Sequence, residues 1–392
     1  MMNLSWFGPD WLSRWQASHA VKKEYEVIDG LRGIAIVLVI ACHLLTFSKS
    51  QSTANQFIGE IFSAGRCGVL LFFGLSGFLI SLPFWVRKRQ GQQALLPPGY
   101  MSKRFWKIYP AFAVSIFFCV PIYAKIYGVD YAWDAAWRWI IGYPLFAPVS
   151  PYFNGVMWTL VVEVHFYLTL PILFFLTKSL SYNFVLIFMF FAVFLAPGCY
   201  LMHLESQGEG PSFIPMIDTK YPSLFAGFGF GVVLAGLEVS QRLRRNFASL
   251  AVMGCIILVL SMIAQAWSVV FLGGAWGISK IVYFIQLGAV GLMILLVLDS
   301  RHWLSLGLSA RPLRWLGIIS YEWYLFHQPI HHLYSHFVGA ADGSLMKWLL
   351  RISAVFASSL AIAAVVYLFF SKPILEWGRR KASLNVDRDL RK

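Results

Sequence analysis

Charged residues are scarce in this sequence. They make up 13% of its 392 residues, whereas a soluble domain carries about 25%. Hydrophobic residues make up 58%, and the mean hydropathy is +0.66. A water-exposed surface cannot be built from so few charges, so the bilayer must act as part of the solvent. The sequence therefore predicts an integral membrane protein and excludes an ordinary water-soluble enzyme.

Acidic residues and cysteines are also few. The 18 Asp and Glu residues face 32 Lys and Arg residues, which gives a formal charge of +14. In a membrane protein, such an excess marks cytoplasmic loops, so we expect no nucleic-acid partner. The five cysteines form no Cys-x-x-Cys pair. We expect them to be small core residues, and we expect no metal site.

Long apolar runs dominate the chain. A spanning helix needs about 20 mostly apolar residues, and about ten segments qualify: 28–47, 67–86, 108–127, 156–176, 183–203, 221–238, 247–266, 280–298, 314–337 and 346–370. Most Lys and Arg residues fall in alternate loops, which places both termini in the cytoplasm. The predicted fold is an all-α polytopic membrane protein. It comprises a cytoplasmic or interfacial segment (1–27), a transmembrane domain (28–371) and a basic cytoplasmic tail (372–392).

The first predicted span carries two ionisable residues, Arg32 and His43. Eleven residues are close to three helical turns, so both side chains share a face, about 16 Å apart along the axis. Ionisable residues inside a membrane are costly and often functional, and histidine is the commonest general base. The structural alternative is an arginine that extends to the interface and a histidine bonded to another helix. The sequence alone leaves both interpretations open.

Two further predicted spans contain polar groups. Glu163 has no basic neighbour in sequence, so it must pair with another helix or be protonated. It either orients His43 or Arg32 or forms a structural ion pair. The run Ser320–Pro329 is so polar that it must face the interior or a cavity. Three later histidines favour an interfacial polar role over a metal site: His331, His332 and His336.

Two other patterns bear on packing and on ligands. Gly74 and Gly77 lie in one predicted span, which is typical of close helix packing through small residues. Arg104 and Lys107 stand three residues apart at the entry of the third span, so they share a helix face. They either anchor the helix at the cytoplasmic interface or bind the phosphates of a cytoplasmic donor.

Four motifs together carry a resemblance to a known family. Asp29-Gly30-Leu31-Arg32-Gly33 opens the first span, and Arg32 is followed after ten residues by His43. The other motifs come in the family's order: Phe72–Ile80, Trp158–Tyr167 with Pro171, and Ser320–Pro329. The sequence resembles the acyltransferase-3 family of membrane O-acyltransferases. Larger members append an SGNH-type hydrolase-like domain. Because the chain ends 22 residues after its last predicted span, we expect the stand-alone form.

The resemblance implies acyl transfer from a cytoplasmic acyl-CoA, most often acetyl-CoA, to a hydroxyl group. The acceptor would be a cell-surface glycan, a lipid-linked sugar or a small hydroxylated molecule, in a bacterial inner membrane with its lipid. Arg32, Arg104 and Lys107 would hold the donor. Lys107 stands where the family often has a second arginine, so a cation is kept but the bidentate fork is lost.

The same resemblance implies the remaining roles. His43 would take the proton of the acceptor hydroxyl, and Glu163 would orient a cation or raise the basicity of His43. His327, Tyr324 and Asp29 would bind substrate. The main alternative is a transporter or flippase that uses Arg32, Glu163 and His327 as a substrate or proton relay. The sequence shows no pair of Gly- or Pro-broken helices in corresponding halves, which such transporters favour. A structural protein would leave the buried charges unexplained.

Overall fold

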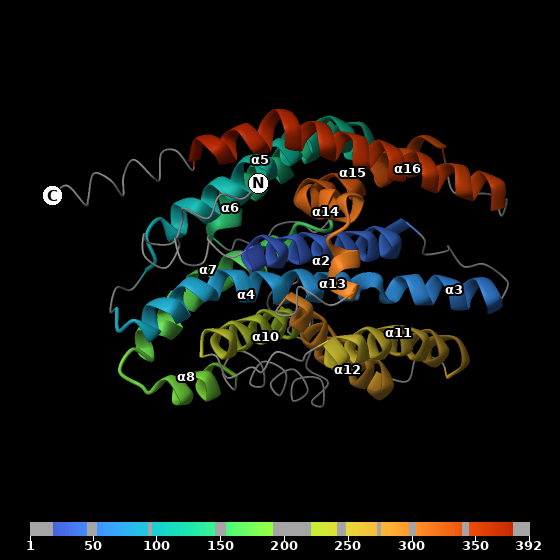
Figure 1. Cartoon of the computed structure of the whole chain (residues 1–392). Coiled ribbons are helices and arrows are strands. Elements are labelled where there is room, and N and C mark those ends of the chain that lie inside the picture. Colours follow the sequence, from blue (N-terminus) through green and yellow to red (C-terminus); the bar gives the residue numbers. More distant parts are fainter. Residues whose placement is uncertain are drawn as a thin grey trace.

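The structure is a computed structural model and describes residues 19–44, 53–92, 96–145, 154–190, 221–240, 248–272, 276–297, 303–338 and 345–378. Within these ranges all regular structure is helical. The long helices lie roughly side by side, with α2 in the middle and α5 and α16 along one edge of the bundle (Figure 1).

Nine helices correspond to predicted spans: α2 (His19–Leu44), α4 (Cys67–Arg89), α5 (Tyr100–Tyr127), α7 (Trp158–Leu176), α8 (Tyr182–Met189), α10 (Tyr221–Val239), α11 (Ala248–Phe271), α12 (Trp276–Ile294) and α16 (Leu345–Val366). The fifth predicted span is described only up to residue 190. Shorter elements connect or extend them: α3 (Thr53–Ser63), η1 (Ala64–Arg66), α6 (Val129–Leu145), η3 (Leu295–Val297), α13 (Trp303–Leu308) and the π-helical turn η4 (Tyr367–Ser371).

Six helical stretches are long and apolar enough to cross a membrane: Glu26–Leu44, Gln56–Arg89, Tyr100–Tyr127, Trp158–Leu176, Ser249–Phe271 and Leu349–Gly378. Two shorter apolar stretches are Phe225–Val239 and Phe284–Ile294. A helical membrane protein is therefore confirmed, whereas the count of ten spans and the cytoplasmic termini stay predictions. The proposed boundaries at 27 and 372 also stay predictions; residues 1–18 and 379–392 lie outside the described ranges.

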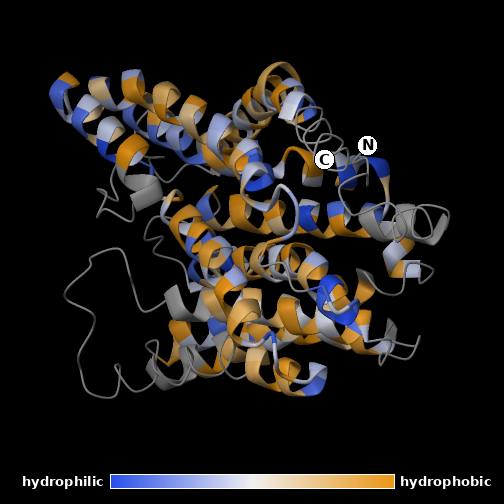
Figure 2. Ribbon diagram, turned by 90° about the vertical axis from the view of Figure 1, so that its left-hand side faces the viewer, coloured by the Kyte–Doolittle hydropathy of each residue, from blue (hydrophilic) through white to orange (hydrophobic). Residues whose placement is uncertain are grey.

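Large hydrophobic side chains cover the outside of the bundle. On α11, Val259 and Leu260 are more than half exposed, and so is Val365 on α16. Hydrophobic colours accordingly run along the outer helices in Figure 2. In water such surfaces would be costly, whereas acyl chains cover them without penalty. The exposed apolar surface supports the assignment to the bilayer.

The ninth predicted span, 314–337, is not one helix. It consists of α14 (Arg311–Ile318) and α15 (Ser320–Val338), which are separated at Ile319. The amphipathic α14 docks against α2, where Arg314 forms a 3.1 Å ion pair with Glu26. This docking sets the direction of α14, so the chain has to turn before α15 enters the bundle.

The basic ends of several helices gather at one end of the bundle. Lys88, near the end of α4, donates to the carbonyls of Thr177 and Lys178 just after α7, at 2.8 and 3.3 Å. Arg89 donates to the carbonyl of Val239 at the end of α10. We call this the basic end. The alternation of Lys and Arg along the sequence predicts this gathering.

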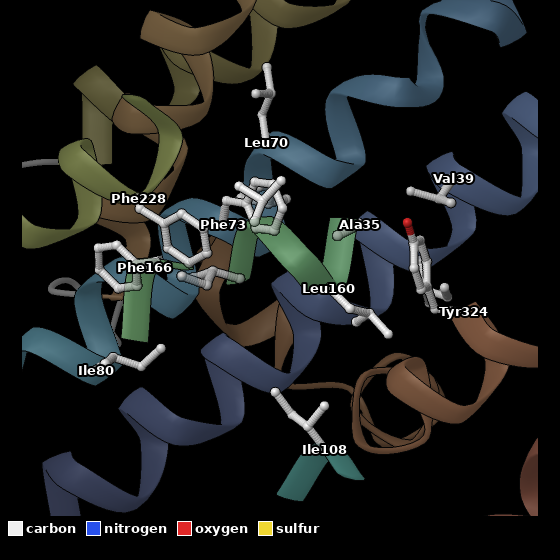
Figure 3. Close-up of a cluster of buried hydrophobic side chains, with 14 of the residues drawn as sticks. Ala35, Val39, Leu70, Phe73, Ile80, Ile108, Leu160, Phe166, Phe228 and Tyr324 are labelled. Carbon is white, nitrogen blue, oxygen red and sulfur yellow. The ribbon is translucent and has the colours of Figure 1, made fainter. Parts of the chain in front are cut away.

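Close packing of α4 against α10 depends on glycine, as the sequence predicts for Gly77. A Cβ atom at Gly77 would collide with the backbone carbonyl of Phe228, and one at Gly231 with that of Gly74. Beside this contact, the ring of Phe228 stacks on Phe73 and Phe166, with centroid distances of 4.5 and 4.0 Å (Figure 3). The aromatic core can form because the two backbones approach this closely.

We expect Gly77→Ala to destabilise the protein by roughly 1–3 kcal/mol, because overpacking a fixed interface forces the helices apart. Thermal unfolding in detergent measures the change. Gly288→Ala on α12 is the matched control, since its Cβ would meet nothing within 4 Å. Equal unfolding temperatures for the two variants would contradict the packing argument.

Candidate active site

The helix α2 forms the centre of the candidate site. Val27, Leu31 and Ile36 on this helix are fully buried, and α4, α14 and α15 pack along it. Arg32 and His43 are half-buried on α2, and both contact α15. The shared face predicted from helix geometry is therefore occupied by one neighbouring helix.

Glycines explain part of the Asp-Gly-Leu-Arg-Gly motif. A Cβ atom at Gly30 would collide with the carbonyl of Leu308, and one at Gly33 with that of Leu313. From the other side, a Cβ atom at Gly317 would collide with the carbonyl of Asp29. The α13 and α14 backbones therefore lie directly against α2, one turn from Arg32. The motif packs this end of the helix closely while it presents one arginine.

Charged side chains from four helices gather around Arg32. Its Nη2 atom donates to Ser320 Oγ at 3.3 Å. Asp29 interacts electrostatically with Arg32 and Lys107, and Lys107 interacts with Arg104 and Glu163. We call Asp29, Arg32, Arg104, Lys107, Glu163 and Glu322 the charged cluster. Lys107 and Arg104 come from α5, and Glu163 from α7.

Tyrosines hold two members of the charged cluster. The Tyr167 hydroxyl donates to Glu163 one turn earlier on α7. The Arg104 guanidinium lies over the rings of Tyr100 and Tyr167, 5.8 and 5.6 Å from their centroids. Because Tyr100 in turn donates to the Tyr167 carbonyl at 3.1 Å, α5 and α7 are locked together here. Glu163 thus lies next to two cations of α5: it interacts with Lys107 and shares Tyr167 with Arg104.

Sequence reasoning did not select Glu322, although it lies in the polar run of the ninth predicted span. Its side chain is 4% exposed, and it interacts electrostatically with Arg32 and Lys107. A buried carboxylate needs such partners. The signal available in the sequence was an acidic residue inside a predicted membrane span.

Two arginines of the charged cluster each have a buried nitrogen atom that makes no hydrogen bond to the described residues. Arg32 Nε and Arg104 Nε are buried and have no hydrogen-bond partner among the described residues. A buried unsatisfied donor costs about 1–3 kcal/mol, more for a charged group. Anionic oxygens, such as those of phosphates, satisfy guanidinium donors well. The cluster therefore fits a phosphate-bearing ligand.

Further along α2 from Arg32, His43 of α2 pairs with His327 of α15. His327 Nε2 is 3.2 Å from His43 Nδ1, and the ring centroids are 4.9 Å apart. His327 is fully buried. Its Nδ1 atom lies 2.8 Å from the Tyr324 carbonyl and 3.2 Å from the Trp323 carbonyl. His43 Nδ1 also lies 3.0 Å from the Val39 carbonyl.

These contacts define the proton positions of the neutral pair. A carbonyl can only accept, so His327 Nδ1 carries hydrogen and its Nε2 is an acceptor. His43 Nδ1 faces that acceptor and the Val39 carbonyl, so it must carry hydrogen as well. A neutral imidazole has one N–H, which leaves the lone pair of His43 on Nε2. The arrangement presents a base and an acceptor that would stabilise its protonated form.

Tyr324 secures α15 close to this pair. Its hydroxyl is 2.8 Å from Thr159 Oγ1 and donates to the Val156 carbonyl at 3.0 Å. The hydroxyl predicted to bind substrate is therefore engaged with Thr159 of α7 and with Val156 just before it, and it positions the turn that carries His327.

The fold and this interior define a polytopic helical membrane protein with a charged cluster at one depth and a histidine pair at another. A family described as acyltransferase domain, acyltransferase-3, matches residues 25–368. The chain belongs to this acyltransferase family, as the four sequence motifs indicate. No solved structure matches it.

Several curated relatives match along most of the chain. Peptidoglycan O-acetyltransferase OatA of Listeria monocytogenes is 28% identical over 384 residues, which covers 91% of this chain and 57% of the relative. The putative peptidoglycan O-acetyltransferase YrhL of Bacillus subtilis is 26% identical, covering 92% and 56%. O-acetyltransferase OatA of Staphylococcus aureus is 22% identical, covering 90% and 57%. The chain thus spans little more than half the length of these relatives.

Proposed function

We propose that this chain is a membrane O-acyltransferase that moves an acyl group, acetyl in the first instance, from acyl-CoA to a hydroxyl of a glycan acceptor. The observation that carries the proposal is the His43–His327 pair, which lies on the same face of α2 as Arg32. Family membership and the O-acetyltransferase names of the relatives support the reaction. Two relatives are named for peptidoglycan, which makes an envelope glycan the first acceptor to test.

The charged cluster would hold the donor. Arg32 and Arg104 offer buried guanidinium nitrogens, and Lys107 adds a point charge beside them. Phosphates of CoA would enter from the basic end, which we expect to face the cytoplasm because Lys and Arg are in excess there. From there the thioester would extend along α2 towards His43, about 16 Å from Arg32 along the helix axis.

His43 would act as the general base. Its Nε2 takes the proton of the acceptor hydroxyl while that oxygen attacks the thioester carbonyl carbon. The new ester C–O bond forms, the C–S bond breaks, and the sulfur leaves with the electron pair. The proton on His43 then passes to the sulfur, which yields the free CoA thiol. A thioester is already activated, so positioning and one base can suffice.

His327 would be a positioning residue. By accepting from His43 Nδ1, it keeps the lone pair on Nε2 and stabilises the imidazolium that forms. We expect His327→Ala to lower kcat by about 10- to 100-fold, less than the roughly 10²- to 10⁴-fold effect of losing a general base itself, with little change in KM for the donor. His327→Gln should restore part of kcat, because its amide oxygen can accept the same hydrogen bond. Steady-state kinetics with acetyl-CoA measures both variants, and equal losses would contradict the role.

A direct assay separates this proposal from transport. The purified protein in detergent is incubated with radiolabelled acetyl-CoA and peptidoglycan fragments, with no membrane and no gradient. Acetyl transfer to the glycan, or slow thioester hydrolysis that depends on His43, is the expected result. Well-folded protein that neither binds nor hydrolyses acetyl-CoA or longer acyl-CoAs would contradict the proposal.

A further inference from the structure

Far from the basic end, α15 and α16 share a second cationic group. Arg351 Nη2 on α16 is 3.1 Å from His331 Nε2 and donates to Ser335 Oγ at 3.2 Å. His332 on the same turn of α15 lies 3.3 Å from the Tyr123 hydroxyl of α5. We call Arg351, His331 and Ser335 the outer triad. The His332 contact fixes the triad's helix against α5.

The position of Arg351 is unusual for a lipid anchor. It is the third residue of the apolar stretch Leu349–Gly378, where an arginine commonly extends along the helix to reach the headgroups. Here Leu349 and Leu350 are exposed on the outside, whereas the guanidinium turns inwards to α15. His331 and Ser335 remain half-buried. The positive charge of Arg351 is thus directed towards α15, while the side chains of His331 and Ser335 are partly exposed.

The outer triad lies next to the histidine pair. His331 follows His327 by four residues, so both project from one face of α15, about 6 Å apart along its axis. His331 also interacts electrostatically with His43. Seen from the charged cluster, the triad lies beyond the base. A molecule that reaches His43 from this side would pass the guanidinium of Arg351, which contacts His331.

Hydrogen-bond polarity indicates what the triad would bind. A guanidinium only donates, so His331 Nε2 accepts from Arg351, and the His331 hydrogen is on Nδ1. The triad therefore gathers a guanidinium, an imidazole N–H and a hydroxyl in one patch. Such donors suit carboxylate and phosphate oxygens. Among the described residues no group of three or more His, Cys, Asp or Glu side chains could hold a metal ion.

We propose that the outer triad is an acceptor subsite that binds an anionic group of the acceptor, a carboxylate or a phosphate, while the hydroxyl that is acylated lies at His43. This rests on the proposed function for its biological meaning, but anion binding can be measured without turnover. A carboxylate would belong to the glycan itself, whereas a phosphate would belong to a lipid-linked sugar.

The test measures equilibrium binding to the full chain in detergent. The probes are octyl glucoside as the neutral reference, octyl glucuronide as the carboxylate and octyl glucoside 6-phosphate as the phosphate, in a detergent without sugar. We expect the wild type to bind at least one anionic probe about tenfold more tightly than the neutral one. Arg351→Gln should remove that preference, and Arg351→Lys should keep part of it. Lys125→Gln, which removes an exposed cation near the end of α5, should leave the preference intact.

Each outcome decides the proposal. A preference for the glucuronide assigns the subsite to a glycan carboxylate, and a preference for the phosphate assigns it to a lipid-linked sugar. Equal binding of all three probes by the wild type would overturn the subsite. So would an Arg351→Gln variant whose binding of neutral and anionic probes falls by the same factor, because Arg351 would then serve the fold alone. Acetyl-CoA hydrolysis by the same preparation reports separately on the proposed function.

Discussion

His43→Ala is expected to abolish acyl transfer while donor binding survives. Removing a general base typically costs 10²- to 10⁴-fold in rate, and no described side chain other than His327 makes a hydrogen bond to the His43 ring. We expect His327 to substitute poorly, because its Nε2 lone pair faces the position of the His43 Nδ1 atom and not the hydroxyl that meets His43 Nε2. We therefore expect a loss of at least about 10³-fold in kcat, with the Kd for acetyl-CoA changed less than threefold.

Radiolabelled acetyl transfer measures kcat, and equilibrium binding of acetyl-CoA measures Kd. The matched control is His336→Ala, which removes an exposed histidine from the last turn of α15. Transfer by His43→Ala at a rate within tenfold of the wild type would remove His43 from the mechanism. If binding and turnover were lost together, we would assign His43 to the donor site instead.

Arg32→Ala is expected to weaken acetyl-CoA binding by about 10- to 100-fold, because a hydrogen bond to a charged group contributes about 1.5–3 kcal/mol. The buried Arg32 Nε and the Nη2 contact with Ser320 place the planar fork where phosphate oxygens would meet it. Arg32→Lys should recover only part of the affinity, since an ammonium cannot reproduce the fork.

Comparison with a truncated donor makes this test specific. Acetyl-pantetheine has the thioester but no phosphate, so its affinity should be the same in the wild type and in Arg32→Ala. Arg138→Gln is the control, because Arg138 pairs with Asp134 on α6 and both side chains are exposed. An equal loss for both donors would show that Arg32 acts through the shape of the site and not through phosphate.

Much of the architecture could be predicted because the sequence of each helix alone indicates its length and its polar face. Apolar length predicts the spans, and helix geometry predicts that Arg32 and His43 share a face. The polar run Ser320–Pro329 likewise indicates an interior helix. By contrast, the turn at Ile319 depends on the docking of α14 against Asp29 and Glu26. That contact between distant segments leaves no local pattern.

The pairing within the site could not be predicted for the same reason. The rotation of α15 against α2 decides that His327, and not Glu163, lies within hydrogen-bond distance of His43. It also brings Glu322 to Arg32. Sequence reasoning found both His327 and Glu163 as buried polar groups, but it had no means to assign partners across helices. The roles of these residues stay predictions until the variants are measured.

The contacts that complete α2 join residues 288 and 284 positions apart in the chain. At about 5–20 residues per second, the ribosome would synthesise α15 roughly 15–60 s after Arg32. For that interval the arginine would be in the membrane without Ser320 or Glu322, at a considerable energetic cost. Lipid headgroups or an insertion factor must accommodate the charge until the last helices arrive. Nascent chains arrested before residue 320 should therefore hold α2 displaced towards the basic end.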